Sequence, residues 1–122
     1  MAVPNIAFEA PEMDSGRALK QGRPIDLVHL ATQTMGDKTL EMEVLQMFAK
    51  QARSCLQALA REGENAGAVA HRLKGAANAV GAFDVAAIAA EIEAKGADAS
   101  RIAAVTLSVI EAENFILKLS RA

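Results

Sequence analysis

Hydrophobic positions recur at helical spacing along most of this chain. One apolar stripe, within residues 38–62, is formed by Leu40, Val44, Met47, Phe48, Ala52, Cys55, Leu56 and Leu59. A second, within residues 98–120, is formed by Ile102, Val105, Val109, Ala112, Ile116 and Leu119. Intervals of three and four residues place such positions on one face of a helix. No segment alternates apolar and polar residues as a half-buried strand would, so the pattern predicts an all-α protein.

Capping residues and glycines divide the helical pattern into five elements. Helices are predicted over residues 25–35, 38–62, 65–80, 84–95 and 98–120. Their starts are marked by Pro24, Asp37 and Asp84, and their ends by Gly36, Gly63, Gly81 and Gly96. Proline suits a first helical turn, aspartate suits an N-cap, and glycine commonly follows the last turn.

Four of these helices have similar reach and are joined by short loops. Short loops make consecutive helices run antiparallel, so the expected fold is an antiparallel four-helix bundle with a short additional N-terminal helix laid across one end. Residues 1–23 mix prolines, glycines and charges without a stable period, and we expect an N-terminal arm that is partly flexible. The bundle is assigned to residues 24–122.

Composition narrows the possible functions. The 122-residue chain is 52% hydrophobic but only 3% aromatic, and its net charge is −2 without a basic stripe, so nucleic acid is not an expected partner. Cys55 is the only cysteine and falls on an apolar stripe, which suits a reducing compartment. The chain begins without a secretory signal pattern and has no run of about 20 apolar residues, so we expect a cytoplasmic protein with no membrane partner.

The predicted helix over residues 65–80 presents a histidine away from the core. At about 100° per residue, Val69, Leu73 and Val80 share one side of this helix and His71 points to the opposite side. The residues around His71 are Gly67, Ala68, Lys74, Gly75 and Asn78. Glycine costs a helix interior about 1 kcal/mol relative to alanine. Gly75 therefore indicates that clearance beside the imidazole matters more than helix stability.

This arrangement has two interpretations. An exposed imidazole is a nucleophile near neutral pH, and the Lys74 ammonium one turn away is placed to contact the oxygens of an anion on the ring. Together these features predict a site that receives and transfers a phosphoryl group. A surface histidine beside a lysine on an alanine-rich helix is also compatible with an ordinary solvated face.

The segment AHRLKGAANAVGA, residues 70–82, resembles the signature of histidine-containing phosphotransfer domains, in which H-x-L-K-G is followed by a second glycine six residues later. The resemblance extends over about residues 24–119. It implies that His71 exchanges a phosphoryl group with aspartates of response-regulator receiver domains. It also implies that the domain is not an enzyme in its own right, since the catalytic groups and Mg²⁺ belong to the partner.

The resemblance assigns further residues to the site. It implies that Lys74 contacts phosphoryl oxygen, and that Glu93, late in the next helix, accepts a hydrogen bond from Nδ1 of His71. Glu93 is equally compatible with a surface acid at a helix end. Receiver docking and clearance are assigned to Ala68, Arg72, Gly75, Asn78, Gly81 and Ala82. Ala76 and Ala77 depart from the family, because many members have a serine after the glycine.

Other chemistry finds little support in the sequence. Two histidines, one cysteine and scattered acids lack the spacing of a metal site, and no Walker-type or G-x-G-x-x-G loop is present, so we expect no metal and no cofactor. His29 is interpreted as a boundary histidine, and Glu41, Glu43, Glu62 and Glu64 as solvated. The expected partners are receiver domains and a hybrid histidine kinase, with the chain itself a monomer. The alternative function is a helical adaptor that binds receiver or kinase domains without carrying phosphate.

Overall fold

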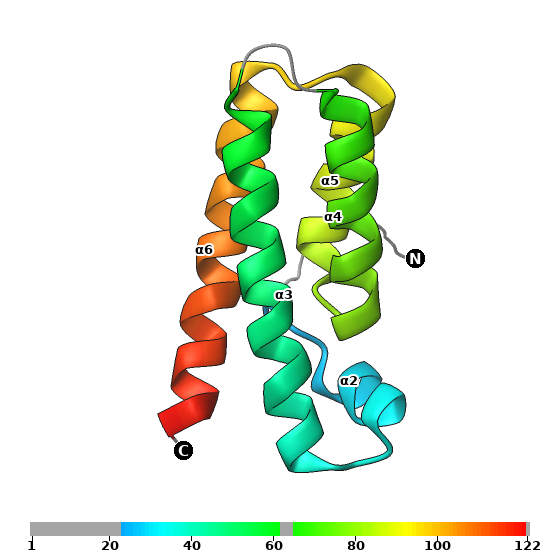
Figure 1. Ribbon diagram of the computed structural model, residues 1–122, viewed down its shortest axis with the longest axis vertical. Helices are drawn as coiled ribbons and strands as arrows, with labels where there is room; N and C mark the ends of the chain where they lie inside the picture. The colour runs from blue at the N-terminus through cyan, green and yellow to red at the C-terminus, as the bar shows by residue number, and fades with distance from the viewer. Residues whose placement is uncertain (1–22, 62–64, 122) are drawn as a thin grey trace, which may run out of the picture.

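The computed structural model describes residues 23–61 and 65–121, and this part of the chain contains helices and no strand. Four long helices form the bundle, and a short helix lies across one of its ends (Figure 1). The elements are α2 (Leu27–Thr34), α3 (Lys38–Leu59), α4 (Ala66–Val80), α5 (Phe83–Lys95) and α6 (Ala99–Arg121). The fold class predicted from the sequence is confirmed, whereas most of the expected arm, residues 1–22, lies outside the described residues.

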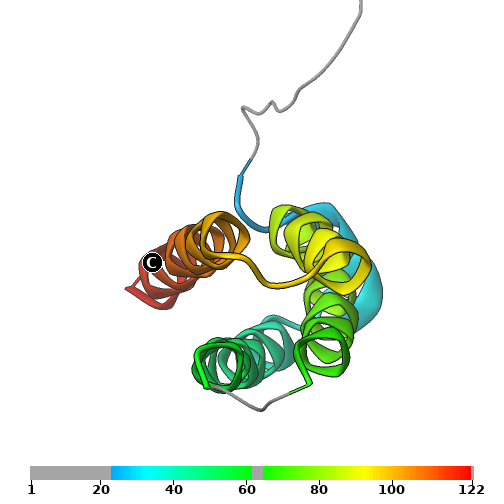
Figure 2. The same cartoon turned by 90° about the horizontal axis from the view of Figure 1, so that it is seen from above.

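The long helices are arranged so that each contacts two neighbours. Along the bundle axis, α4 packs against α3 and α5, and α6 packs against the same two helices, so α4 and α6 occupy opposite corners (Figure 2). The short α2 contacts α3 and α4. This is the expected result of four amphipathic helices burying their apolar stripes in one common core.

The helix boundaries agree with the sequence at several caps and differ at others. Asp37 caps α3 by accepting from the Leu40 amide, as predicted. Asp26, not Pro24, starts α2, because its carboxylate accepts two amide N–H groups and so satisfies two helix donors at once. Asp84 is not the cap of α5: Ala82 occupies that position without a side-chain bond. Asp84 instead lies in the first turn, where a negative charge favours the positive end of the helix dipole.

The helix predicted over residues 38–62 is shorter than expected. It ends at Leu59, and Ala60 takes the cap position with its amide bonded to the Leu56 and Ala58 carbonyls. Gly63, the predicted stop, lies outside the described residues, as do Glu62 and Glu64.

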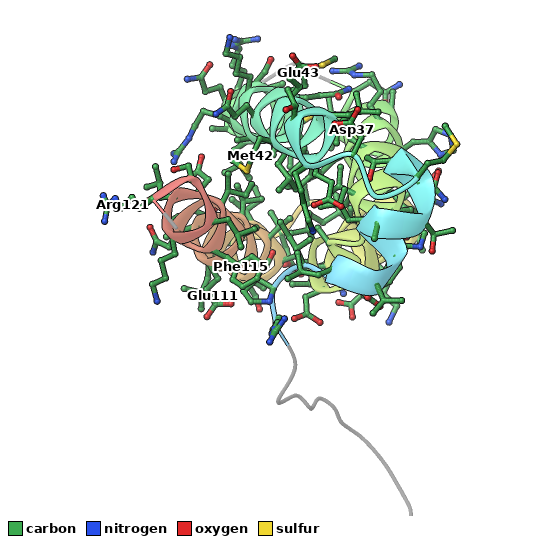
Figure 3. The ribbon with its side chains drawn as sticks, turned by 90° about the horizontal axis from the view of Figure 1, so that it is seen from below. Asp37, Met42, Glu43, Glu111, Phe115 and Arg121 are labelled. Atoms are coloured by element: carbon green, nitrogen blue, oxygen red, sulfur yellow. The ribbon has the colours of Figure 1, made fainter. Side chains whose placement is uncertain are left out.

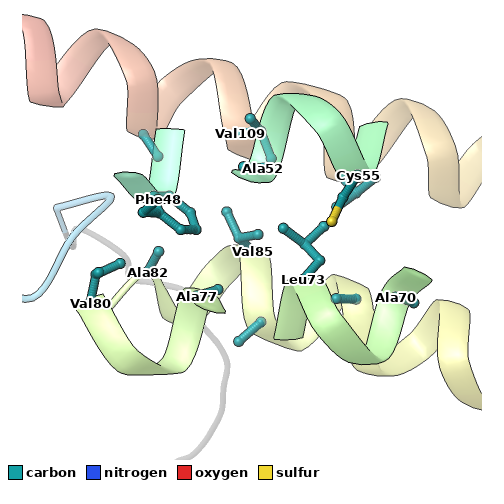
Figure 4. Close-up of a cluster of buried hydrophobic side chains, with 14 of the residues drawn as sticks. Phe48, Ala52, Cys55, Ala70, Leu73, Ala77, Val80, Ala82, Val85 and Val109 are labelled. Carbon is teal, nitrogen blue, oxygen red and sulfur yellow. The ribbon is translucent and has the colours of Figure 1, made fainter. Parts of the chain in front are cut away.

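The core consists mainly of small and branched side chains from the four long helices, together with Phe48 of α3, Leu30 of α2 and Ile25 just before α2. Leu73 of α4 is fully buried and meets the buried Cys55 of α3 in this cluster (Figure 4). Two residues of the predicted α3 stripe lie on its outer side, because Met47 is 67% exposed and Leu40 is 37% exposed. The free cysteine is buried, as its place on the apolar stripe predicted.

One predicted surface acid is buried. Glu41 is only 7% exposed and accepts from the Thr34 hydroxyl of α2 and from the Lys38 ammonium. A carboxylate is tolerated there because both of its oxygens have partners. The contact joins the end of α2 to the start of α3, which sequence periodicity alone did not indicate.

Candidate functional site: a histidine clamped by a carboxylate

His71 lies on the outer face of α4, at the middle of the helix. Its side chain is 67% exposed, whereas Val69, Leu73 and Val80 of the same helix are buried. The helical layout derived from the sequence is therefore confirmed for this helix. The histidine is held by a helix whose opposite face is anchored in the core, which fixes where the imidazole is presented.

Glu93, near the end of α5, binds two residues of α4 at once. Its Oε2 atom lies 2.8 Å from Nδ1 of His71, and its Oε1 atom accepts from Nζ of Lys74 at 2.7 Å. Both distances are those of charge-assisted hydrogen bonds. The carboxylate therefore joins the two residues that the sequence analysis had placed one turn apart on α4.

The ionisation of Glu93 follows from these contacts. The hydrogen bond from Lys74, and after it the hydrogen bond from His71, lower the pKa of the Glu93 carboxyl below its ordinary value of 4.5. The carboxylate is thus ionised at neutral pH. An ionised carboxylate accepts hydrogen bonds and donates none.

The proton of the neutral His71 ring is assigned by the same contact. Since Glu93 only accepts, Nδ1 must carry the proton, and the lone pair then resides on Nε2. Nε2 is the ring nitrogen that Glu93 does not occupy, on a side chain that is largely exposed. The site therefore presents a nucleophilic nitrogen to the outside of the bundle.

The surface around His71 is open. A Cβ atom added at Gly75 would have no neighbour within 4 Å apart from its own helix and chain neighbours. Ala68 and Asn78, one turn before and two turns after His71, are also exposed. The surface has small side chains on either side of the histidine, so another protein can approach the ring closely.

Two residues expected at this surface have a different role. Ala82 is fully buried, so it is unavailable for contact with a partner. Gly81 is also buried and ends α4 with a φ of +85°. Its carbonyl accepts from the Asp26 amide at 2.9 Å, and an added Cβ would lie 2.8 Å from the Asp26 carbonyl oxygen. Gly81 therefore allows the start of α2 to lie against the end of α4.

Arg72 lies beside the site and also reaches α3. Burial raises the pKa of the Cys55 thiol above 9.0, and the nearby Arg72 guanidinium partly opposes this rise. The Arg72 side chain is exposed, so it remains accessible on the edge of the His71 surface that faces α3.

The second histidine is not part of this site. His29 of α2 packs edge-on against Phe83, with ring centroids 5.1 Å apart, and its Nε2 is buried without a hydrogen-bond partner. This agrees with its interpretation as a boundary residue. Among the residues that the structure describes, no group of three or more His, Cys, Asp or Glu side chains is arranged to hold a metal ion.

One contact of the site was not predicted from the sequence. Lys74 was expected to contact a phosphoryl oxygen. In the structure its ammonium is bonded to Glu93, and its side chain is 32% exposed. The signal for this pairing was weak, since the acid lies 19 residues away on another helix. Only the packing of α5 against α4 brings the two charges together.

Comparison with known proteins identifies the class of this bundle. A family model described as the Hpt domain matches residues 43–117, more than half of the chain. The chain therefore belongs to the Hpt domain family, which confirms the resemblance noted in the sequence. As an Hpt domain it takes part in phosphorelay signalling and interacts with response-regulator receiver domains.

A solved structure supports the same conclusion. The fold is similar to that of the histidine phosphotransferase ShpA from Caulobacter crescentus, with a TM-score of 0.68 and 25% sequence identity. The similarity covers 80% of this chain and 91% of ShpA. A search of curated proteins found no significant match. In the described part of the chain, no helix is both long and apolar enough to cross a membrane.

Proposed function

We propose that His71 accepts a phosphoryl group from the aspartate of one receiver domain and passes it to the aspartate of another. The observation that carries this proposal is the 2.8 Å contact between Nδ1 of His71 and the Glu93 carboxylate. A carboxylate that holds the proton on Nδ1 leaves Nε2 as the nucleophile. A histidine of a passive docking surface has no need of this arrangement, so the contact favours phosphotransfer over the adaptor alternative.

The transfer step follows from the geometry of the ring. The Nε2 lone pair forms a bond to phosphorus as the bond between phosphorus and the receiver's aspartyl oxygen breaks, and the aspartate leaves as a carboxylate. The ring gains positive charge as the N–P bond forms. Glu93 lies on the Nδ1 side, where its negative charge stabilises the developing imidazolium. The reverse step returns the phosphoryl group to a receiver aspartate and restores the neutral ring.

Lys74 has two possible anionic partners in this cycle. Before transfer it is bonded to Oε1 of Glu93, and through Glu93 it helps to hold the His71 ring. After transfer the phosphoryl oxygens lie one helical turn away, within the range of neighbouring side chains on a helix. We propose that the ammonium then contacts a phosphoryl oxygen, which stabilises the phosphorylated state.

The remaining catalytic groups are proposed to come from the receiver domain. This chain acts as a carrier: it supplies the nucleophile, the orienting carboxylate and a surface open to docking, while the partner supplies Mg²⁺ and its own carboxylates. We place the docking surface around Ala68, Arg72, Gly75 and Asn78, which are exposed on α4 beside His71. Because Gly75 adds no side chain there, the receiver's phosphoaspartate can approach Nε2 in line.

The test is phosphoryl transfer from a radiolabelled receiver domain in the presence of Mg²⁺. We expect the full chain to acquire label that is stable in base and labile in acid, as a phosphoramidate is. The His71→Ala variant should keep the helical fold and take up no label. His29→Ala is the matched control and should be labelled as the parent is. Label retained by His71→Ala, or lost only in His29→Ala, would contradict the assignment.

A further inference from the structure

Helix α6 is apolar on two opposite sides. Its inner side is buried in the bundle and includes Val105, Val109 and Ala112. Its outer side carries Leu107 and Ile110, which are 58% and 37% exposed. A helix at the corner of a bundle normally has a polar outer side, and a helix apolar all round is normally buried. Three large apolar side chains, Leu107, Ile110 and Leu117, are therefore exposed on the outer side of α6, with the polar Asn114 among them.

Six exposed residues of α6 lie at heptad spacing along its outer side. We define the α6 seam by its six exposed positions, which are Ala103, Leu107, Ile110, Asn114, Leu117 and Arg121. Their intervals are four, three, four, three and four residues, the spacing by which two helices pack along a common seam. With Leu107, Asn114 and Arg121 at a positions, Ala103, Ile110 and Leu117 take the d positions.

We infer that the α6 seam is a homodimer surface, on which α6 of a second copy packs in parallel. Asn114 gives the direction. In a parallel pair each Asn114 amide lies opposite its own copy and the two hydrogen-bond, as a polar a position does in two-stranded coiled coils. The other polar a residue, Arg121, is the last residue of α6 and is exposed, so the two guanidinium groups remain in water. In an antiparallel pair centred on this seam, Asn114 would lie opposite Ile110, and its amide would be buried without a partner.

Charges beside the seam agree with the parallel arrangement. Glu113 is at a g position and already accepts from the Arg53 guanidinium of α3 in its own chain. Lys118, five residues further along, is exposed at an e position. Parallel helices bring g and the following e′ together, so Lys118 of the second copy would join the Arg53–Glu113 pair. Glu111 and Arg121 project outward from this helix (Figure 3), clear of the core.

This surface does not compete with phosphotransfer. No contact joins α6 to α4, and the two helices occupy opposite corners of the bundle (Figure 2). A dimer formed through α6 therefore leaves both His71 side chains open to receiver domains. The dimer would be a bivalent carrier, and its formation does not depend on His71 being phosphorylated. The proposed dimer differs from the monomer expected from the sequence.

The seam is short, so the dimer should be weak. From Ala103 to Arg121 it spans about 27 Å at 1.5 Å per residue. One helix pair of this length buries less than the roughly 1,600 Å² of a standard interface. We therefore expect a weak dimer, whose dissociation sedimentation velocity of the full chain will resolve between about 1 μM and 1 mM, the range of weak affinities.

The first set of variants tests whether the dimer interface lies on the α6 seam. Leu107→Glu combined with Ile110→Glu places four acids in the seam of a dimer. It should remain monomeric over the same concentration range, with unchanged helical content and unchanged phosphotransfer per His71. Met47→Glu is the control, since it replaces an exposed apolar residue of α3 outside the seam, and it should dimerise like the parent. A parent chain that stays monomeric, or a dimer that survives the double substitution, would overturn the proposal.

The second set of variants tests whether the two α6 helices run parallel. Leu117→Cys should form a disulfide with its own copy under mild oxidation, because identical d positions face each other in a parallel pair. A mixture of Leu117→Cys and Leu107→Cys should form no mixed disulfide, since ten residues along a helix separate these positions by about 15 Å. Mixed disulfides without the Leu117→Cys homodimer would establish an antiparallel pair and overturn the parallel one. The native Cys55 is buried and does not interfere.

Discussion

Substitution of Gly75 should change the stability of the protein and its rate of phosphotransfer in opposite directions. Nothing lies within 4 Å of an added Cβ, so alanine fits without any shift of neighbouring atoms. Alanine is favoured over glycine in a helix interior by about 0.8–1.0 kcal/mol. For a folded domain of about 100 residues this raises Tm by about 4–8 °C. Gly75→Gln also gains most of this helix propensity, because position 75 is exposed.

The same substitutions should slow phosphotransfer. A side chain at position 75 stands one turn from His71 on the surface where the receiver must approach. A displacement of about 1 Å from the productive geometry costs roughly a hundredfold in rate, so we expect glutamine to slow transfer far more than alanine. Thermal unfolding followed by circular dichroism gives the first quantity, and the rate of label uptake gives the second.

Gly81→Ala, at the C-terminal end of the same helix, is the contrasting variant. At φ +85° an L-residue costs about 1–2 kcal/mol, and the new Cβ would meet the Asp26 carbonyl oxygen at 2.8 Å. Its Tm should therefore fall, whereas that of Gly75→Ala rises. If Gly75→Gln transfers phosphate as fast as the parent, the clearance argument is refuted. If both Gly75 variants lose stability, Gly75 packs against a neighbour and the described surface is wrong.

Three further predictions concern the hydrogen bonds that Glu93 accepts from His71 and Lys74. Glu93→Gln keeps an oxygen acceptor for Nδ1 but loses the charge. Transfer in a single-turnover assay should therefore slow by about tenfold, the difference between a charged and a neutral hydrogen bond. An unchanged rate would show that Glu93 is an ordinary surface acid. Lys74→Met should shorten the lifetime of phosphohistidine by about tenfold or more while Tm changes little; an equal lifetime would show that Lys74 never contacts phosphate. Because the hydrogen bond from Lys74 lowers the pKa of Glu93 below 4.5, the Glu93–Lys74 ion pair is present above pH 4.5 and is lost as pH falls through the lowered folded-state value. Lys74→Met removes the largest cause of that lowering, so the Glu93 carboxyl should titrate at higher pH by NMR, and an unmoved titration would contradict the assignment.

The helices were predictable because their signals are local. The apolar stripe of α6 and the Asp37 cap depend on residues within one or two turns, and both were confirmed. The start of α2 was placed wrongly because proline and aspartate both favour a helix start, and only the Asp26 hydrogen bonds decide between them. The exposure of Met47 was not predicted either. When an apolar stripe is wider than the buried face of its helix, the sequence does not show which of its residues lie outside the core.

The site was only partly predictable for a related reason. That His71 points away from the core follows from helical period alone. Its partner Glu93 came from the family resemblance, and the bond between Lys74 and Glu93 came from neither, because it depends on the distance between two packed helices. Gly81 carried a correct signal for a helix end, but its second role against Asp26 involves a segment 55 residues earlier in the chain.

The packing of α4 against α5 explains why the Glu93 carboxylate contacts both His71 and Lys74. Glu93 lies on α5, which begins almost directly after α4 ends at Gly81, so the two helices form one tight antiparallel hairpin. This hairpin holds Glu93 of α5 beside His71 of α4. Lys74 is the adjustable member, because it is held by one hydrogen bond and has a flexible four-carbon stem. A receiver domain therefore meets a ring whose orientation is set in advance and a cation that is able to move from Glu93 to the incoming phosphoryl group. Loss of Glu93 should disturb transfer in both directions, whereas loss of Lys74 should chiefly shorten the life of the phosphorylated state.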